Sequence, residues 1–314
     1  MSATNFWFND SNSGRTAVAG TSSAVDRASA SMYVCDETII RAINVAGVTG
    51  RPLLVDGPSG CGKSSLARYV AWFMNWRMLF FPVTSRTQAT DLLYIVDQLA
   101  RLQDAQAKKL RDIGEYIRPG VLWEAFDPEG AKLRKGSKQT ESDVSSESLV
   151  LPARGAKKGA VVLIDEIDKA DPDVPNNLLL PLGSYEFLVP ELTIDVVAQT
   201  APFIVLTTNN ERKLPPAFLR RCVHLTVPAP DYARLVTVGK SHFGETVSDG
   251  LMATVAKLLT DNPSGTRGDG GVSIAEYLDA VRACDSLNID PQSDDWKWIR
   301  SIIFAKQERV AGAR

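Results

Sequence analysis

The chain has 314 residues, 44% of them hydrophobic and 23% charged, which is enough for two domains with buried cores of their own. Its 35 Lys and Arg against 37 Asp and Glu leave a formal net charge of −2, which excludes a general basic field for holding nucleic acid. The four cysteines lack CxxC spacing, and the most apolar stretch, Tyr69 to Val83, is interrupted by Asn75 and Arg77, so we expect reduced thiols, no membrane span and a cytoplasmic protein.

Alternating apolar and polar segments predict the first large domain. Residues 1–32 are rich in Ser, Ala, Asn and Thr, which predicts a flexible N-terminal tail. A helix is predicted over Glu37 to Ala46, followed by a short buried strand over Pro52 to Val55. Four similar apolar runs follow at Met78–Phe81, Ala160–Ile164, Phe203–Leu206 and Val223–Val227. Five such strands predict an α/β fold with a five-stranded parallel sheet between helices, over residues 33–228.

Two insertions and a helical tail complete the predicted organisation. Residues 132–158 combine basic ends with a Ser- and Glu-rich centre, which predicts an exposed loop; contact with nucleic acid or an acidic partner is the alternative. Residues 185–199 alternate apolar and polar side chains after Pro190, which predicts a β-hairpin. Beyond Pro228, apolar residues at helical spacing in 251–259, 274–281 and 296–303 predict a smaller all-α domain over 229–314.

One motif carries the strongest chemical signal. It fits G-x-x-x-x-G-K-[ST] and lies between the first strand and a helix predicted over Ser65 to Phe73. Glycines there let backbone N–H groups surround phosphates, Lys63 can reach the β and γ phosphates of ATP, and the Ser64 hydroxyl can bind Mg²⁺. A chance glycine turn is the alternative, and the position between strand and helix argues against it. The binding residues predicted are Gly57, Pro58, Ser59, Gly60, Cys61, Gly62, Lys63, Ser64 and Ser65.

Two carboxylates follow the strand at residues 160–164. Asp165 and Glu166 lie at the carboxyl edge of the predicted sheet, where ligands of α/β proteins bind. Asp165 is expected beside the Mg²⁺, and Glu166 is expected to accept a proton from, or to orient, the water that attacks the γ-phosphate. An acidic helix N-cap is the alternative.

Further polar residues follow the next two strands. Asn209 follows Thr207 and Thr208 at the end of the strand at 203–206, which is expected beside the strand that carries Asp165. There Asn209 can orient water or the γ-phosphate; a simple turn is the alternative. Arg220 and Arg221 precede the last strand. An arginine offered to the nucleotide of a neighbouring subunit can raise the hydrolysis rate about 10³- to 10⁵-fold. A solvated surface pair accounts for the same spacing equally well.

In this order the segments GPSGCGKSS, LIDEIDKA, VLTTNN and LPPAFLRRC resemble those of AAA+ ATPases. The phrases ATDLLYIVDQLARLQDA, YIRPGVLWEAF and LLLPLGSYEFLVPEL are similar to segments of the MoxR branch, and this resemblance covers roughly residues 33–285. It implies a hexameric ring, an insertion in the second helix, a hairpin before the sensor strand, and von Willebrand factor A domain proteins as partners. It also implies roles for Lys63 and Ser64 in the loop, Asp165 at the metal, Glu166 in catalysis, Asn209 as first sensor, and Arg221 or Arg220 as arginine finger.

One departure from the family lies in the helical domain. The family's second sensor is usually an arginine at the start of a lid helix, but residues 271–277 contain none, and Ala275 stands near the expected place. Arg282 or Arg267 could substitute, and either could equally be a surface charge. How the lid couples to the nucleotide therefore stays open.

These features lead to one main hypothesis: ATP hydrolysis with Mg²⁺ by a ring that acts as a remodelling or assembly chaperone for a protein partner. The first alternative is a nucleic-acid-directed AAA+ motor that uses residues 132–158 or the hairpin, against which the net charge argues. The second is a nucleotide-binding switch with little turnover, which is suggested by the missing second-sensor arginine.

Overall fold

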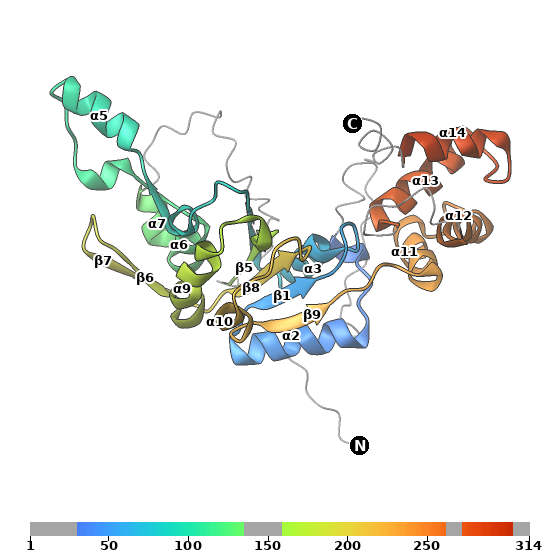
Figure 1. Cartoon of the computed structure of the whole chain (residues 1–314), viewed down its shortest axis with the longest axis horizontal. Coiled ribbons are helices and arrows are strands. Elements are labelled where there is room, and N and C mark those ends of the chain that lie inside the picture. Colours follow the sequence, from blue (N-terminus) through green and yellow to red (C-terminus); the bar gives the residue numbers. More distant parts are fainter. Residues whose placement is uncertain (1–29, 135–158, 262–271, 304–314) are drawn as a thin grey trace, which may run out of the picture. The chain divides into compact units, whose positions relative to one another are not determined.

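The computed structural model describes residues 30–134, 159–261 and 272–303 (Figure 1). The chain forms two compact units. The first comprises Glu37–Val55 and Val70–Leu225, and the second comprises residues 30–36, Asp56–Tyr69 and residues 226–303. Residues 1–29 of the predicted tail lie outside the described residues, whereas its last three form a short 3₁₀ helix, η2 (Ala30–Met32).

The first unit is built on a five-stranded sheet. Its strands are β1 (Leu53–Asp56), β2 (Arg77–Pro82), β5 (Ala160–Asp165), β8 (Phe203–Thr208) and β9 (Val223–Thr226). They lie in the order β2-β5-β8-β1-β9, and β2–β5 and β5–β8 pair in parallel. Every residue of β8 and all of β5 except its terminal Asp165 are buried, so both faces of these central strands are covered. The predicted parallel sheet is confirmed.

Helix α2 (Glu37–Thr49) lies along one face of the sheet (Figure 1). It buries Ile39, Ile43 and Ala46, which share one helical face. The helix was expected to end at Ala46, because Gly47 follows; instead it continues to Thr49 and ends at Gly50, whose φ of 67° favours glycine.

The predicted hairpin at 185–199 is confirmed. Its strands β6 (Glu186–Val189) and β7 (Ile194–Val197) pair antiparallel, with Phe187 opposite Val196. Phe187 and Val189 face the core, while the alternate residues are exposed. In this core Trp123 and Phe126 each lie about 6.0 Å from the Phe187 ring, centroid to centroid.

The expected boundary of the long exposed loop is wrong at its start. Residues 132–134 end the helix α7 (Pro128–Arg134), and the rest of the predicted loop, residues 135–158, lies outside the described residues. Pro128 is favourable at a helix start and Ala131 is buried, which explains why the chain stays helical through basic residues. Five further short helices of this unit are α4 (Ala89–Leu93), α6 (Val121–Phe126), α8 (Asp173–Asn177), α9 (Leu179–Ser184) and α10 (Pro216–Leu219).

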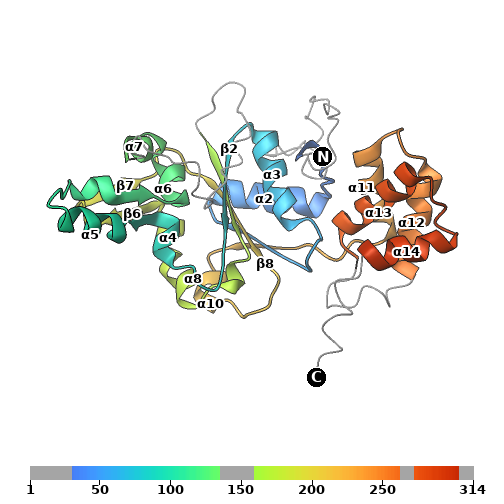
Figure 2. The same cartoon turned by 90° about the horizontal axis from the view of Figure 1, so that it is seen from above.

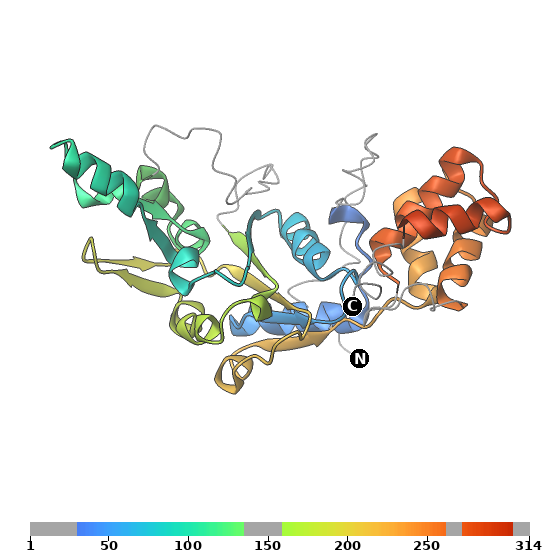
Figure 3. The same ribbon diagram turned by 45° about the horizontal axis from the view of Figure 1, so that its top comes forward.

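An arm extends from the first unit between α4 and α6 (Figure 3). The paired strands β3 (Tyr94–Val96) and β4 (Ile117–Pro119) form its base, and α5 (Gln98–Gln106) and η3 (Ile113–Tyr116) lie beyond them. The residues alone did not predict this arm, although the MoxR resemblance implied an insertion.

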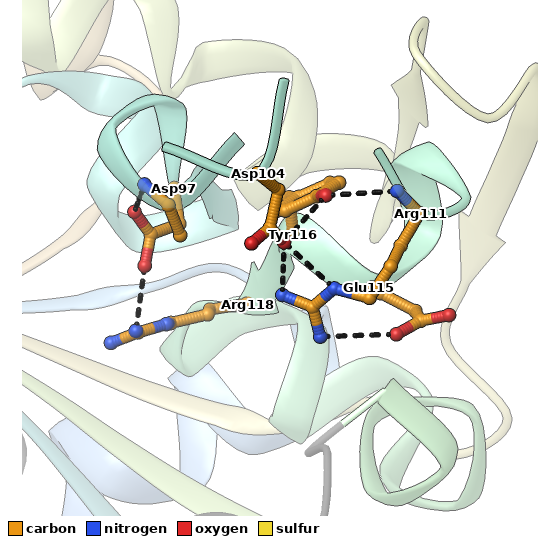
Figure 4. Close-up of polar contacts among 7 residues, drawn as sticks. Asp97, Asp104, Arg111, Glu115, Tyr116 and Arg118 are labelled. Carbon is orange, nitrogen blue, oxygen red and sulfur yellow. Dashed lines mark hydrogen bonds and ion pairs between the residues drawn. The ribbon is translucent and has the colours of Figure 1, made fainter. Parts of the chain in front are cut away.

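Polar contacts hold the arm together (Figure 4). Asp104 accepts hydrogen bonds from the Tyr116 hydroxyl and Arg111, both at 2.9 Å, and Arg118 donates to Asp97 at 2.8 Å. The Tyr116 hydroxyl, and then Arg111, hold the pKa of the Asp104 carboxyl below its usual range. These contacts join α5 to the chain that returns toward β4.

The second unit contains four helices that pack on one another (Figure 2). They are α11 (Tyr232–Phe243), α12 (Asp249–Asp261), α13 (Ile274–Leu287) and α14 (Asp294–Ile303). Leu235, Val255, Tyr277 and Val281 lie in their shared core. The three helical segments predicted beyond Pro228 each lie inside one of these helices, whereas α11 was not singled out.

Candidate functional site

The glycines of the phosphate loop are required by its backbone. Gly57, Gly60 and Gly62 have φ values of 150°, 79° and 100°, which favour glycine. A Cβ atom on Gly57 would lie 2.1 Å from the carbonyl oxygen of Val227, and one on Gly60 would lie 2.1 Å from the Ser273 Cβ. The loop therefore needs glycine both for its curvature and for close packing, as a backbone cradle for phosphate does.

Lys63 begins α3 (Lys63–Met74) directly after the loop, two residues earlier than the helix was expected to start. Its side chain is buried, and Nζ donates to the carbonyl oxygens of Gly57 at 2.6 Å and Pro58 at 2.9 Å. The ammonium group is thus held inside the loop. Ser64 follows in the first turn of the helix, and burial raises the pKa of the Cys61 thiol.

The loop contacts the start of α13 within the second unit. The backbone N–H of Ile274 donates to the Gly60 carbonyl oxygen at 2.9 Å. Ser273 and Glu276 form a capping box that fixes this end of the helix. Ala275 is exposed beside them, so the helix that would carry a second-sensor arginine meets the phosphate loop through its backbone instead.

Of the two arginines considered as a replacement for the second sensor, Arg282 lies in the second half of α13. The Arg282 guanidinium carbon is 5.6 Å from the centre of the Phe243 ring, and Arg267 lies outside the described residues. Tyr33, which the sequence did not single out, is nearer to the loop. A Cβ on Gly62 would lie 3.4 Å from its ring, which also packs on Tyr69 with centroids 5.6 Å apart.

Asp165 is the last residue of β5 in the first unit, and Glu166 follows it directly. Glu166 has left-handed backbone geometry, with φ 60° and ψ 50°, and precedes the short helix η4 (Ile167–Lys169). The Thr207 hydroxyl on neighbouring β8 donates to Asp165 Oδ1 at 2.6 Å and accepts from the Glu166 N–H at 2.8 Å. Thr207 therefore orients both predicted acidic residues, although no pattern in the sequence indicated this role.

Two donors hold the Glu166 carboxylate. The Asn209 amide donates to Oε1 at 2.9 Å, and the Lys169 ammonium donates to Oε2. The bond to Glu166 is the main reason that the pKa of Lys169 is raised. The sequence predicted Asn209 at a strand end beside the strand that carries Asp165, but not its bond to Glu166; Lys169, three residues after Glu166, was missed.

Buried Asp168 connects the same elements. Its Oδ2 accepts from the backbone N–H groups of Asn209 at 3.2 Å and Glu211 at 2.9 Å. These bonds fix the turn that follows β8 and carries Asn209. Asp165, Glu166 and Asn209 are thus brought together by hydrogen bonds within one unit.

Arg220 and Arg221 follow α10, and both side chains are exposed. Within the described residues, neither side chain makes a hydrogen bond or an ion pair. The phosphate loop and the acidic edge belong to different compact units. The predicted site residues are therefore described as two clusters, one in each unit. One is the phosphate loop with Lys63, and the other is the sheet edge with Asp165, Glu166 and Asn209.

Comparison with known proteins identifies the class. The model of the AAA domain (dynein-related subfamily) matches residues 52–222, more than half of the chain, from the residue before β1 to the residue before β9. The chain therefore belongs to this AAA family, whose domain is an AAA+ ATPase domain. A comparison with functionally curated proteins gave no significant match.

Among solved structures, two mutants of Thermotoga maritima RuvB match with 14% sequence identity and a TM-score of 0.47. Each alignment covers 86% of this chain, and 71% and 70% of the two RuvB chains. Separately, none of the helices in the described residues has the length and apolar character needed to cross a membrane.

Proposed function

We propose that this chain hydrolyses ATP and that Glu166 is its catalytic base. The observation that carries this proposal is the pair of donors, Asn209 and Lys169, that hold the Glu166 carboxylate at the carboxyl edge of the sheet. A carboxylate fixed in this way keeps oxygen lone pairs available to a water molecule and can take its proton as the water attacks phosphorus. Asn209 can sense the γ-phosphate through the same contact.

The loop residues supply the binding half of the proposed reaction. Lys63 would exchange the carbonyl oxygens of Gly57 and Pro58 for the β and γ phosphates, which are stronger partners for an ammonium group. The Ser64 hydroxyl and the Asp165 carboxylate are oxygen donors of the kind that Mg²⁺ prefers, and Asp165 is already oriented by Thr207. When bound, the ion would offset negative charge on the phosphates.

We further propose that the chain works as a ring in which Arg220 or Arg221 reaches the nucleotide of the next subunit. Their exposure and lack of partners in the described residues support this role, because a buried or paired arginine could not be offered to a neighbour. A hexamer and a MoxR-like remodelling function are supported by the segments quoted above, and by the hairpin at β6–β7 and the arm before α6. The expected partner is a von Willebrand factor A domain protein, with a protein client.

A single substitution tests the catalytic proposal. Glu166→Gln keeps the size of the side chain but removes the base, so phosphate release should fall at least about 10²-fold, while ATP binding is retained. Phosphate release is measured beside the binding of a fluorescent ATP analogue. The matched control is Glu245→Gln, an exposed glutamate remote in sequence from both clusters, which should keep the wild-type rate.

Four outcomes decide between the functions. Unchanged turnover in Glu166→Gln contradicts the catalytic role. Tight ATP binding by the wild type without phosphate release, in any assembled state, favours the nucleotide-binding switch. Capture of a von Willebrand factor A domain protein by the ATP-loaded Glu166→Gln chain supports the remodelling role, whereas salt-dependent DNA binding that stimulates hydrolysis favours the nucleic-acid motor.

A further inference from the structure

The side chain of Arg51 is bound to the turn that carries the arginine pair. Its Nη2 atom donates to the carbonyl oxygens of Arg220 at 2.6 Å and Cys222 at 2.7 Å, and its Nε donates to that of Arg221 at 3.3 Å. One guanidinium group thus binds three consecutive carbonyl groups. All four residues belong to the first compact unit, although about 170 positions separate them in the sequence.

These carbonyl groups need such a partner. The backbone N–H groups of Arg220, Arg221 and Cys222 donate to carbonyls of α10, whereas the carbonyls of these three residues lie past the helix and meet no further helical turn. A planar guanidinium can satisfy several acceptors from a single side chain with little freedom to move. Arg51 therefore binds the carbonyls of the turn that follows α10, whereas the backbone N–H groups of that turn close the helix itself.

Packing does not hold the turn on all sides. Arg51, Arg220, Arg221 and Cys222 line a cavity of about 260 Å³, together with Leu179, Leu182 and Phe218. Atoms that border a cavity lose part of their contact with neighbours, which reduces the resistance to movement. Because both arginine side chains are also exposed, their direction depends on the backbone that Arg51 holds.

Arg51 is itself fixed on both sides. Gly50 before it has φ 67°, and its carbonyl oxygen accepts a hydrogen bond from the Tyr185 hydroxyl at the base of the β6–β7 hairpin. Pro52 after it leads into β1, and the Pro52 carbonyl accepts from the Val223 N–H at 2.8 Å. The guanidinium therefore starts from a segment that is tied to the sheet and to the hairpin.

We propose that Arg51 is a positioning residue for the Arg220–Arg221 pair, which fixes the direction in which the pair meets a neighbouring subunit's nucleotide. This inference rests on the proposed ring ATPase. It predicts a loss in turnover rather than in binding, because Arg51 acts through the arginine pair, which assists hydrolysis. A displacement of about 1 Å at a reacting group can lower the rate about 10²-fold.

The test uses the full chain with Arg51→Ala and Arg51→Lys. We expect kcat of Arg51→Ala to fall about 10- to 100-fold, with KM for ATP changed less than about threefold. Arg51→Lys keeps the charge but cannot bind three carbonyls with one fork, so its kcat should lie between those of Arg51→Ala and the wild type. The matched control is Arg41→Ala, because Arg41 is an exposed arginine on α2 that pairs with Glu37, and it should keep the wild-type kcat.

Mixed rings distinguish positioning from general damage. Arg51→Ala subunits keep Glu166, and Glu166→Gln subunits keep an ordered arginine pair, so mixing the two inactive forms should restore activity at some interfaces. The double variant Arg220→Ala, Arg221→Ala should behave in the same way. If the melting curve shows that Arg51→Ala does not fold, the same mixing experiment is done with Arg51→Lys.

Two results would overturn the inference. One is a wild-type kcat in Arg51→Ala. The other is an inactive Arg51 variant that Glu166→Gln subunits fail to restore while they do restore the Arg220, Arg221 double variant. If instead the double variant itself hydrolyses ATP at the wild-type rate, the trans-acting arginine is refuted, and the inference fails with it for that separate reason.

Discussion

At the scale of single residues, Thr207 organises the acidic edge. Its hydroxyl is fully buried, donates to Asp165 and accepts from the Glu166 N–H. A valine has nearly the same shape but cannot replace either bond. The Glu166 N–H and the Asp165 carboxylate would each lose the hydrogen bond that Thr207 provides, and such a bond contributes about 0.5–1.5 kcal/mol, or more where one group is charged.

We therefore expect Thr207→Val to lower the free energy of unfolding by about 1–3 kcal/mol and to reduce ATP turnover at least about tenfold, because both acidic residues lose their orientation. Urea denaturation and phosphate release measure the two effects. Thr208→Val is the matched control, since Thr208 is equally buried and its hydroxyl accepts only from Asn210 N–H among the described contacts. Equal losses in both variants would argue against a specific role for Thr207.

The sequence located most of the proposed chemical groups but not the residues that orient them. Lys63, Asp165 and Glu166 could be proposed because each comes soon after an apolar run that predicts a strand, and ligands of α/β proteins bind at the carboxyl ends of strands. The contacts of Thr207 and Arg51 join positions 41 and about 170 residues apart, and no local pattern records such pairs.

At the scale of elements, the phosphate loop and α13 fit closely. Gly60 combines a φ of 79° with a position where a Cβ would lie 2.1 Å from that of Ser273. An alanine there must adopt an unfavourable backbone conformation and also displace the first residue of α13's capping box. Both effects act on the same contact between loop and helix.

Gly60→Ala should therefore lower the free energy of unfolding by at least about 1–3 kcal/mol and weaken ATP binding. Gly250→Ala provides the contrast, because Gly250 lies in α12 and a new Cβ there would have no atom within 4 Å. This variant should have a free energy of unfolding about 0.4–1 kcal/mol higher than the wild type. Denaturation curves and nucleotide titrations provide the measurements. A Gly60→Ala protein with wild-type stability would contradict the close fit.

Element boundaries were predictable to different degrees. The sheet strands were found because their apolar runs are short and end in polar residues. The end of α2 was placed too early, since Gly47 is tolerated inside a helix whose next turn is still supported by Thr49 bonding to Val45. The arm was missed because α5 buries no residue and so shows no apolar face turned to a core.

At the scale of the whole molecule, the two compact units are interleaved along the chain. The described chain passes from one unit to the other after residues 36, 55, 69 and 225. The elements β1, α3 and β9 each contain residues of both units. Unfolding of one unit would therefore disrupt elements that belong in part to the other. This arrangement favours one cooperative unfolding transition.

Buried cysteines provide a test in each unit. Burial raises the pKa of Cys222 in the first unit to about 12 and that of Cys284 in the second to about 11, so neither forms much of the reactive thiolate at pH 8 while folded. In a Cys35→Ser background, which removes the more accessible thiol, both should become alkylated at the same urea concentration. Mass spectrometry of labelled peptides measures this, and reaction of Cys284 at clearly lower urea than Cys222 would show independent unfolding.

Helix α5 is exposed along most of its length. None of its residues is buried, and Leu99 and Leu102 are 66% and 57% exposed, while Asp104 ties the helix to Arg111 and Tyr116 nearby. The sheet core takes no side chain from this helix. Its outer face can therefore be substituted or carry a fluorophore without disturbing the core, which makes α5 a labelling site for single-molecule measurements.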